Sequence, residues 1–242
     1  MLVGQRADRC DTVTPVIRAV TFDADGTLWD FERAMHHAQT LVLAELQSTM
    51  PERAAHLTVS RLMAIRDEVA AELEPQGISL IQVRLAAFER TLEQIGAPDP
   101  ALAARLNALY MHHRMEATRL YDDTLPALDA LADWTLGIIS NGNTDPVRCG
   151  LGGRFQFALF ADQHGPGAPK PHRRMFDVAL GLAACDPSEV LHVGDSLPND
   201  VAAPQLLGIR SVWLNRDGSK NTTGIVPDAE IVSLLELPSL LR

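Results

Sequence analysis

Short apolar segments that end in polar residues, and that alternate with helical segments, constrain the fold of this chain more than any other feature. Residues 16–22 carry one charge, at Arg18, and are typical of a buried strand that ends at Asp23. Further strands are expected at 135–139, 157–160, 190–193 and 210–214, with helices at 175–184 and 201–207. This alternation predicts an α/β fold with a doubly wound parallel sheet that carries helices on both faces.

A long helical block interrupts this alternation. Between Phe31 and Leu120, apolar residues recur three and four positions apart, with breaks near Pro51, 74–77 and 96–98. The block lies between the first and second expected strands, so it forms an insertion over the sheet. We predict an α/β core at 16–30 and 121–242, a helical cap at 31–120 and a loose N-terminal leader at 1–15.

Charge and cysteine content narrow the class of protein. The 21 lysines and arginines against 31 aspartates and glutamates give a net charge of −10, which argues against non-specific nucleic-acid binding. No apolar stretch is long enough to suggest a membrane span. The three cysteines lie far apart, so no zinc site is evident. We expect a cytoplasmic protein that has no nucleic-acid or membrane partner and no evident protein partner.

Polar residues stand where three of the expected strands end. They are Asp23 and Asp25 after the first strand, Ser140 and Asn141 after the second, and Asp195 after the strand at 190–193. Lys170 lies in a loop that precedes a helix. Because ligands bind at the carboxyl ends of the strands in an open parallel sheet, these side chains are expected to converge there.

The chemistry of this set favours phosphoryl transfer. Asp23, Asp25 and Asp195 repel one another unless a hard cation lies between them, and Mg²⁺ prefers oxygen ligands. A lysine and a serine hydroxyl can hold phosphoryl oxygens, and a carboxylate can attack phosphorus. The sequence therefore predicts a magnesium-dependent enzyme that acts on a small phosphorylated substrate.

Four segments then resemble, in order, the motifs of the haloacid dehalogenase superfamily. The segments are Phe22-Asp23-Ala24-Asp25-Gly26-Thr27-Leu28, Ser140-Asn141-Gly142, Lys170-Pro171 and Gly194-Asp195-Ser196-Leu197-Pro198-Asn199-Asp200. Each motif alone is weak, but four in the right order are specific. The resemblance implies a Rossmann-like core with a cap inserted after the first motif, and a phosphatase.

The resemblance also assigns a role to each motif residue. Asp23 is the nucleophile and Asp25 the general acid and base, while Ser140 and Asn141 bind the phosphoryl group and Lys170 orients and neutralises it. The metal ligands are Asp23, the backbone carbonyl of Asp25, and Asp195. Asp200 supports the metal or the lysine. The implied substrate is a small phosphorylated metabolite such as a sugar phosphate, a phosphoglycolate-like compound or a nucleotide monophosphate, hydrolysed through an aspartyl-phosphate.

Other functions remain open at this point. Phosphomutases share these residues, and 2-haloacid dehalogenases resemble the first motif but lack the second acid, which is Asp25 here. From Thr21 to Glu32 the spacing also fits a calcium-binding helix–loop–helix, although Thr21 replaces its first acid. A calcium- or phosphate-binding module without activity is therefore the alternative from a different class.

Two residues outside the motifs are noted for the site. Arg84 falls near the start of a cap helix, after Pro75 and Gly77, where related capped phosphatases often carry a basic residue. We expect it either to contact the substrate or to be a solvated surface arginine. Trp29 directly follows the first motif, where it either packs or lines the mouth of a pocket.

Overall fold

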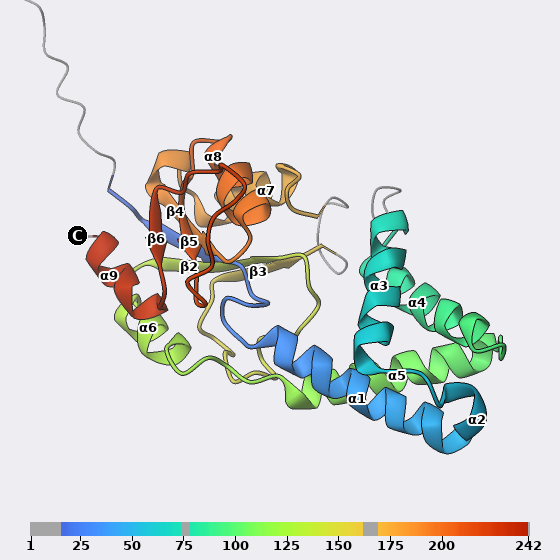
Figure 1. Cartoon of the computed structure of the whole chain (residues 1–242). Coiled ribbons are helices and arrows are strands. Elements are labelled where there is room, and N and C mark those ends of the chain that lie inside the picture. Colours follow the sequence, from blue (N-terminus) through green and yellow to red (C-terminus); the bar gives the residue numbers. More distant parts are fainter. Residues whose placement is uncertain (1–15, 74–77, 162–168, 242) are drawn as a thin grey trace, which may run out of the picture.

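The computed structural model describes residues 16–73, 78–161 and 169–241, and shows an α/β core with a helical unit beside it (Figure 1). The expected leader at 1–15 and the helix break at 74–77 lie outside the described residues. In this part of the chain no helix is both long and apolar enough to cross a membrane.

The core contains a six-stranded sheet in which all paired strands are parallel, in the order β3-β2-β1-β4-β5-β6. The strands are β1 (Ala19–Phe22), β2 (Thr135–Ser140), β3 (Phe157–Phe160), β4 (Val190–Gly194), β5 (Arg210–Leu214) and β6 (Ala229–Ile231). This sheet confirms the predicted fold class. Because β1 lies between β2 and β4, the residues that follow these three strands emerge side by side.

Helices cover both faces of the sheet (Figure 1). On one face α6 (Thr124–Ala130) and α9 (Leu237–Leu240) pack with Phe22 and Ile138 in the larger core cluster. On the other face α7 (Arg174–Ala183) and α8 (Ala203–Gln205) pack with Ala19 and Ile139. Neighbouring residues of one strand point to opposite faces, so an all-apolar strand is buried on both sides.

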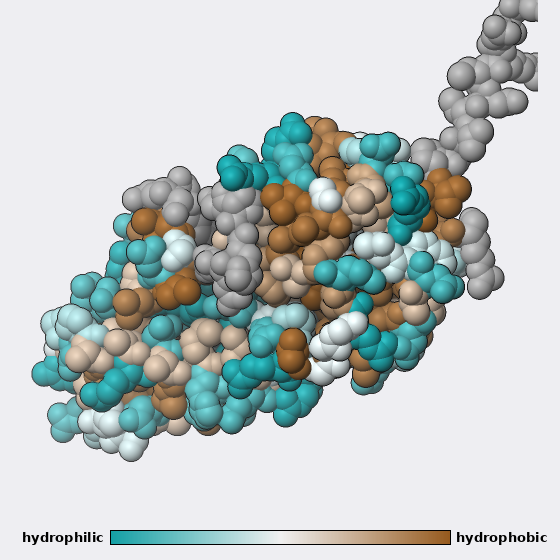
Figure 2. Space-filling view, turned by 180° about the vertical axis from the view of Figure 1, so that it is seen from behind, coloured by the Kyte–Doolittle hydropathy of each residue, from teal (hydrophilic) through white to brown (hydrophobic). Residues whose placement is uncertain are grey.

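The helical unit has its own hydrophobic core, which includes Leu46, Leu92 and Leu106. Its helices are α1 (Phe31–Thr49), α2 (Pro51–Ala54), α3 (Val59–Leu73), α4 (Leu80–Gln94) and α5 (Pro100–Ala117). Local signals start them: Asp30 and Asp99 accept backbone N–H groups at the starts of α1 and α5, and Ser79 forms a capping box with Gln82. Figure 2 shows polar side chains over much of this unit, with apolar ones interspersed.

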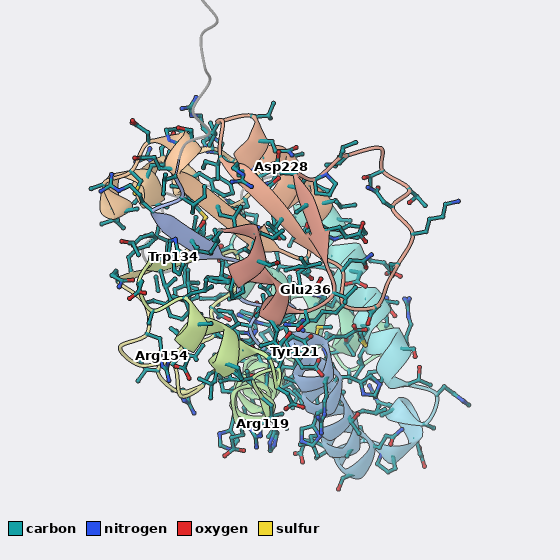
Figure 3. The ribbon with its side chains drawn as sticks, turned by 90° about the vertical axis from the view of Figure 1, so that its left-hand side faces the viewer. Arg119, Tyr121, Trp134, Arg154, Asp228 and Glu236 are labelled. Atoms are coloured by element: carbon teal, nitrogen blue, oxygen red, sulfur yellow. The ribbon has the colours of Figure 1, made fainter. Side chains whose placement is uncertain are left out.

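Two linkers join the helical unit to the core, and they run side by side. Trp29 forms a bridge with Leu120, and the Asp30 N–H donates to the Arg119 carbonyl at 3.0 Å. Arg119 and Tyr121 mark the second linker, which lies between α5 and α6 (Figure 3). The chain therefore leaves the core and returns to it at one place, next to the loop that follows β1.

Three sequence expectations need correction. Thr21 lies inside β1, and a strand cannot supply the entering helix of a calcium-binding helix–loop–helix. The helix expected at 201–207 instead begins as a π-helical segment, Leu197–Ala202, and continues as the short α8. The three-residue strand β6 was not expected, because a segment this short carries no readable alternation.

Candidate active site

The ends of β1, β2 and β4 bring the motif residues together. Asp23 follows β1 directly, Ser140 ends β2 and Asp195 follows β4. Phe22 pairs with Ile138 on one side and with Val193 on the other, so the three ends are level with one another. The convergence expected at the carboxyl edge of the sheet is therefore present.

Lys170 lies at the centre of this edge, between two carboxylates. Its Nζ donates to Asp23 Oδ1 at 2.7 Å and to Asp200 Oδ1 at 2.6 Å, and all three residues are buried. Burial alone lowers the pKa of Lys170, but Asp200 and Asp23 outweigh it and raise that pKa above its ordinary value. The lysine is therefore a permanent cation between the first and last motifs.

Asp200 is held by more than the lysine. Its Oδ2 accepts the Ser196 N–H at 3.0 Å, and its Oδ1 lies 3.3 Å from His192 Nε2. Although burial raises the pKa of Asp200, Lys170 and His192 lower it to about 2. Asp200 therefore stays ionised and supports the lysine.

His192 is a site residue that sequence reasoning missed. It is fully buried in β4, where its Nδ1 lies 2.8 Å from Thr21 Oγ1, and burial lowers its pKa. The only signal was a histidine within an otherwise apolar strand. The ring links β1 to Asp200 and so fixes the direction of that carboxylate.

Asn141 fixes the loop that carries Lys170. Its Oδ1 accepts the Lys170 backbone N–H at 2.7 Å, and its Nδ2 donates to the Lys170 carbonyl at 2.8 Å. This pairing is a role that the motif resemblance did not assign. Ser140, also buried, accepts the Gly142 N–H with its Oγ at 3.0 Å.

Asp25 is oriented from two sides. Its Oδ1 accepts the Trp29 Nε1–H at 2.6 Å, while its Oδ2 lies against the α-carbon of Gly142, where an added Cβ would overlap it. Burial raises the pKa of Asp25, and the Trp29 hydrogen bond and the Arg114 charge oppose that rise. Trp29 is fully buried, so it packs and does not line a pocket mouth.

Carboxylates in this edge offer oxygen ligands to a cation. One oxygen each from Asp23, Asp195 and Asp200 lies within 4.8 Å of the others. Burial, together with the charges of Asp200 and Asp25, raises the pKa of Asp195 to about 6. Burial, Asp200 and Asp195 likewise raise the pKa of Asp23, against the influence of Lys170. This all-oxygen, mutually repelling set fits a hard divalent cation, which would favour the ionised forms.

Gly26 allows Asp195 of the last motif to lie close to the loop of the first motif. Its φ of +83° belongs to the left-handed region, and a Cβ there would lie 2.5 Å from Asp195 Oδ2. Glycine therefore satisfies both the turn and the close passage of Asp195.

The helical unit contributes a buried arginine that sequence reasoning also missed. Arg114 of α5 donates from Nη2 to Asn143 Oδ1 at 2.5 Å, and its guanidinium lies 5.3 Å from the centre of the Phe31 ring. No pattern marks it, because it stands in an ordinary basic last turn of a helix. The bond connects α5 to the loop after β2.

Arg84 lies on α4, half-buried, where it lines a small cavity of about 10 Å³ with Gln39 and Arg66. Burial raises the pKa of Tyr110, whereas the charges of Arg114 and Arg84 lower it. The charge of Asp25 also raises the pKa of Tyr110.

Comparisons with known proteins agree with this arrangement. The family model described as haloacid dehalogenase-like hydrolase matches residues 17–208. The chain is 30% identical to the Escherichia coli 5-amino-6-(5-phospho-D-ribitylamino)uracil phosphatase YigB, over 93% of this chain and 96% of that protein. Among solved structures, the 2-haloacid dehalogenase from Pseudomonas syringae is 33% identical with a TM-score of 0.74, covering 93% of this chain and 98% of that one. The magnesium-bound putative hydrolase YfnB from Bacillus subtilis is 25% identical with a TM-score of 0.77, covering 94% and 99%.

The contact between Gly142 and Asp25 predicts the effect of one added methyl group. Gly142→Ala places a Cβ inside the van der Waals radius of Asp25 Oδ2, so either the carboxylate or the loop must move. We expect the free energy of unfolding to fall by about 1–3 kcal/mol, measured by denaturant titration. Gly181→Ala is the matched control, because it adds the same methyl in α7 with no atom within 4 Å. Equal stability of the two variants would contradict the prediction.

Proposed function

Because the chain belongs to the haloacid dehalogenase-like hydrolase family, we propose that it is a magnesium-dependent phosphatase that hydrolyses a small phosphorylated metabolite through an aspartyl-phosphate on Asp23. One observation carries the proposal: Lys170 Nζ lies 2.7 Å from Asp23 Oδ1, on the same edge as Asp25. Sugar phosphates, phosphoglycolate-like compounds and nucleotide monophosphates are the proposed substrate classes. A cytoplasmic location is part of the same proposal.

Asp23, Asp195 and the backbone carbonyl of Asp25 are the residues that would hold Mg²⁺. Asp200 is the supporting residue, because its oxygens already accept from Lys170 and Ser196. The metal, when bound, supplies positive charge to the phosphoryl oxygens. The cluster of Asp23 with Asp195 and Asp200 within 4.8 Å supports this assignment.

In the proposed reaction, each of the motif residues has a separate task. Asp23 attacks phosphorus, and the bond to the leaving-group oxygen breaks while Asp25 gives that oxygen a proton. Water then attacks the aspartyl-phosphate as Asp25 takes up a proton, which releases phosphate and restores both carboxyl groups. Lys170 keeps Asp23 oriented and offsets phosphoryl charge, and Ser140 and Asn141 bind the phosphoryl group.

Similarity to a 2-haloacid dehalogenase makes dehalogenation the second candidate. Asp25 favours the phosphatase, because a leaving alkoxide needs a proton and a leaving halide does not. The approach of Asp25 Oδ2 to the Ser140–Gly142 loop supports that acid role. Phosphomutases share these residues and remain a related alternative. Release of inorganic phosphate from esters, measured against halide release from 2-chloropropionate, separates the first two.

Replacement of the nucleophile tests the covalent mechanism. Asp23→Asn should reduce phosphate release to background and leave the fold intact, because an amide cannot form the acyl-phosphate while Lys170 still pairs with Asp200. Asp133→Asn, which changes an exposed carboxylate, is the control. Wild-type rates in Asp23→Asn, with deamidation excluded by mass spectrometry, would refute the mechanism.

Removal of the metal tests the cofactor. Exhaustive chelation should abolish phosphate release, and Mg²⁺ should restore it, because Lys170 alone does not offset the carboxylates of Asp23, Asp195 and Asp200. Calcium should restore it poorly, since its larger and looser coordination disturbs the in-line geometry. Full activity in chelated enzyme, with residual metal measured by elemental analysis, would exclude a metal requirement.

We also propose that Arg84, near the start of α4 in the helical unit, contacts the leaving group of the substrate. Arg84→Ala should lower kcat/KM for the best natural substrate by about 1.5–3 kcal/mol, the range for a lost charged hydrogen bond. A featureless aryl phosphate should respond much less. The control is Arg90→Ala on the same helix, where an exposed arginine pairs with Glu72 at 3.0 Å. Equal kcat/KM for the natural substrate in the two variants would show that Arg84 does not contact the leaving group.

A further inference from the structure

Trp29 makes the shortest side-chain contact to the carboxyl group that the proposed mechanism uses as acid and base. Its Nε1 lies 2.6 Å from Asp25 Oδ1, and the residue is fully buried. A distance this short is typical of a donor on an ionised acceptor. The proposed mechanism gives Trp29 no task, although a buried indole N–H usually has a hydrogen-bond partner, here Asp25.

The backbone fixes the indole in this position. Gly26 turns the chain, its N–H donates to the Trp29 carbonyl at 3.0 Å, and Asp25 forms a bridge with Trp29. Trp29 also bridges to Leu120 on the second linker. These backbone contacts and the burial of Trp29 hold the ring beside Asp25, so its N–H favours one orientation of the carboxyl group.

The two oxygens of Asp25 have different surroundings as a result. Oδ1 faces the indole, and Thr144 Oγ1 stands 3.5 Å away, at the limit of a hydrogen bond. Oδ2 lies against Gly142: a Cβ added to this glycine would overlap Oδ2 and would lie 3.3 Å from Ser140 Oγ. Oδ2 thus lies against Gly142, in the Ser140–Gly142 segment proposed to bind the phosphoryl group.

We propose that Trp29 is a positioning residue that holds Asp25 Oδ1, so that Oδ2 is the oxygen that exchanges protons with the substrate. The proton on Oδ2 passes to the leaving-group oxygen as its bond to phosphorus breaks, and Oδ2 later takes a proton from the attacking water. Trp29 touches neither substrate nor phosphoryl group. This inference rests on the proposed acid–base function of Asp25.

The test removes the N–H and keeps an aromatic ring. Trp29→Phe should lower kcat about ten- to hundredfold for an alkyl phosphate, which needs a proton on its leaving group, with little change in KM. The loss should be several-fold smaller for 4-nitrophenyl phosphate, whose leaving group departs without a proton. In an Asp25→Ala background the same change should cause no further loss, because Trp29 acts only through that carboxylate.

Trp134→Phe is the matched control. Its Nε1 donates to the Ile17 carbonyl at 3.1 Å, at the amino end of β1 and β2 and away from the site (Figure 3). It also loses one indole hydrogen bond, and its kinetics should equal those of the wild type. If Trp29→Phe fails to fold by circular dichroism, benzothienylalanine at position 29 keeps the bicyclic shape and removes only the donor.

Three results would overturn the inference. Equal losses for alkyl and aryl esters would show a general structural effect, and so would losses that add to those of Asp25→Ala. Unchanged kcat for the alkyl ester would show that Asp25 needs no such support. If Asp25→Ala itself affects both esters equally, the acid–base function of Asp25 fails, and the role of Trp29 fails with it.

Discussion

Mutual repulsion of carboxyl groups is the constraint on which this structure depends. Asp23, Asp25, Asp195 and Asp200 all meet at the carboxyl edge of the sheet, because β1 and β4 are neighbours and each ends in acidic residues. Lys170 offsets two of these charges through contacts of 2.7 and 2.6 Å. Burial first, and then the charge of Asp200, raises the pKa of Asp195 to about 6 despite the nearby lysine. Four carboxyl groups thus share one lysine at this edge, and this is the physical basis for the cation proposed at Asp23 and Asp195.

The surroundings of Asp200 and Asp25 shift the pKa values of these two carboxyl groups in opposite directions. Asp200 is buried, yet contacts with Lys170 and His192 bring its pKa to about 2 and keep it charged. Asp25 accepts an indole N–H, and burial raises its pKa, which suits the acid and base role proposed for it. Identical side chains thus acquire pKa values shifted in opposite directions through what packs against them.

The sequence predicted the fold and the motif residues because both follow from short-range patterns. A buried strand that ends in acids marks Asp23 and Asp25, and parallel pairing places Ser140 and Asp195 beside them without further information. His192, Arg114 and Trp29 escaped assignment because their roles depend on partners that the fold supplies. Arg114 meets Asn143 across 29 residues of chain, and His192 meets Thr21 across 171. The bond of Trp29 to Asp25 spans only four residues, but it requires the Gly26 turn to bring the ring back. Patterns of apolar residues describe burial, and they do not describe which buried polar atoms pair.

Insertion of the helical unit directly after β1 places a strict demand on the loop that carries Asp25. This loop must hold a carboxyl group in place and also connect two parts of the molecule. Bonds from distant segments meet the demand: the Tyr121 N–H and the Thr124 hydroxyl both donate to the Leu28 carbonyl, at 3.2 and 2.7 Å. Arg216 donates to the Thr27 carbonyl at 2.8 Å, and Asp123 fixes Arg216 in turn. Each carbonyl of the loop that lacks a partner within a strand or helix would be costly if left buried and unpaired. The donors to these carbonyls come from the second linker and from the segment after β5. They anchor the loop to the α/β core at the point where the helical unit is attached. The position of Asp25 is therefore set by contacts with the core.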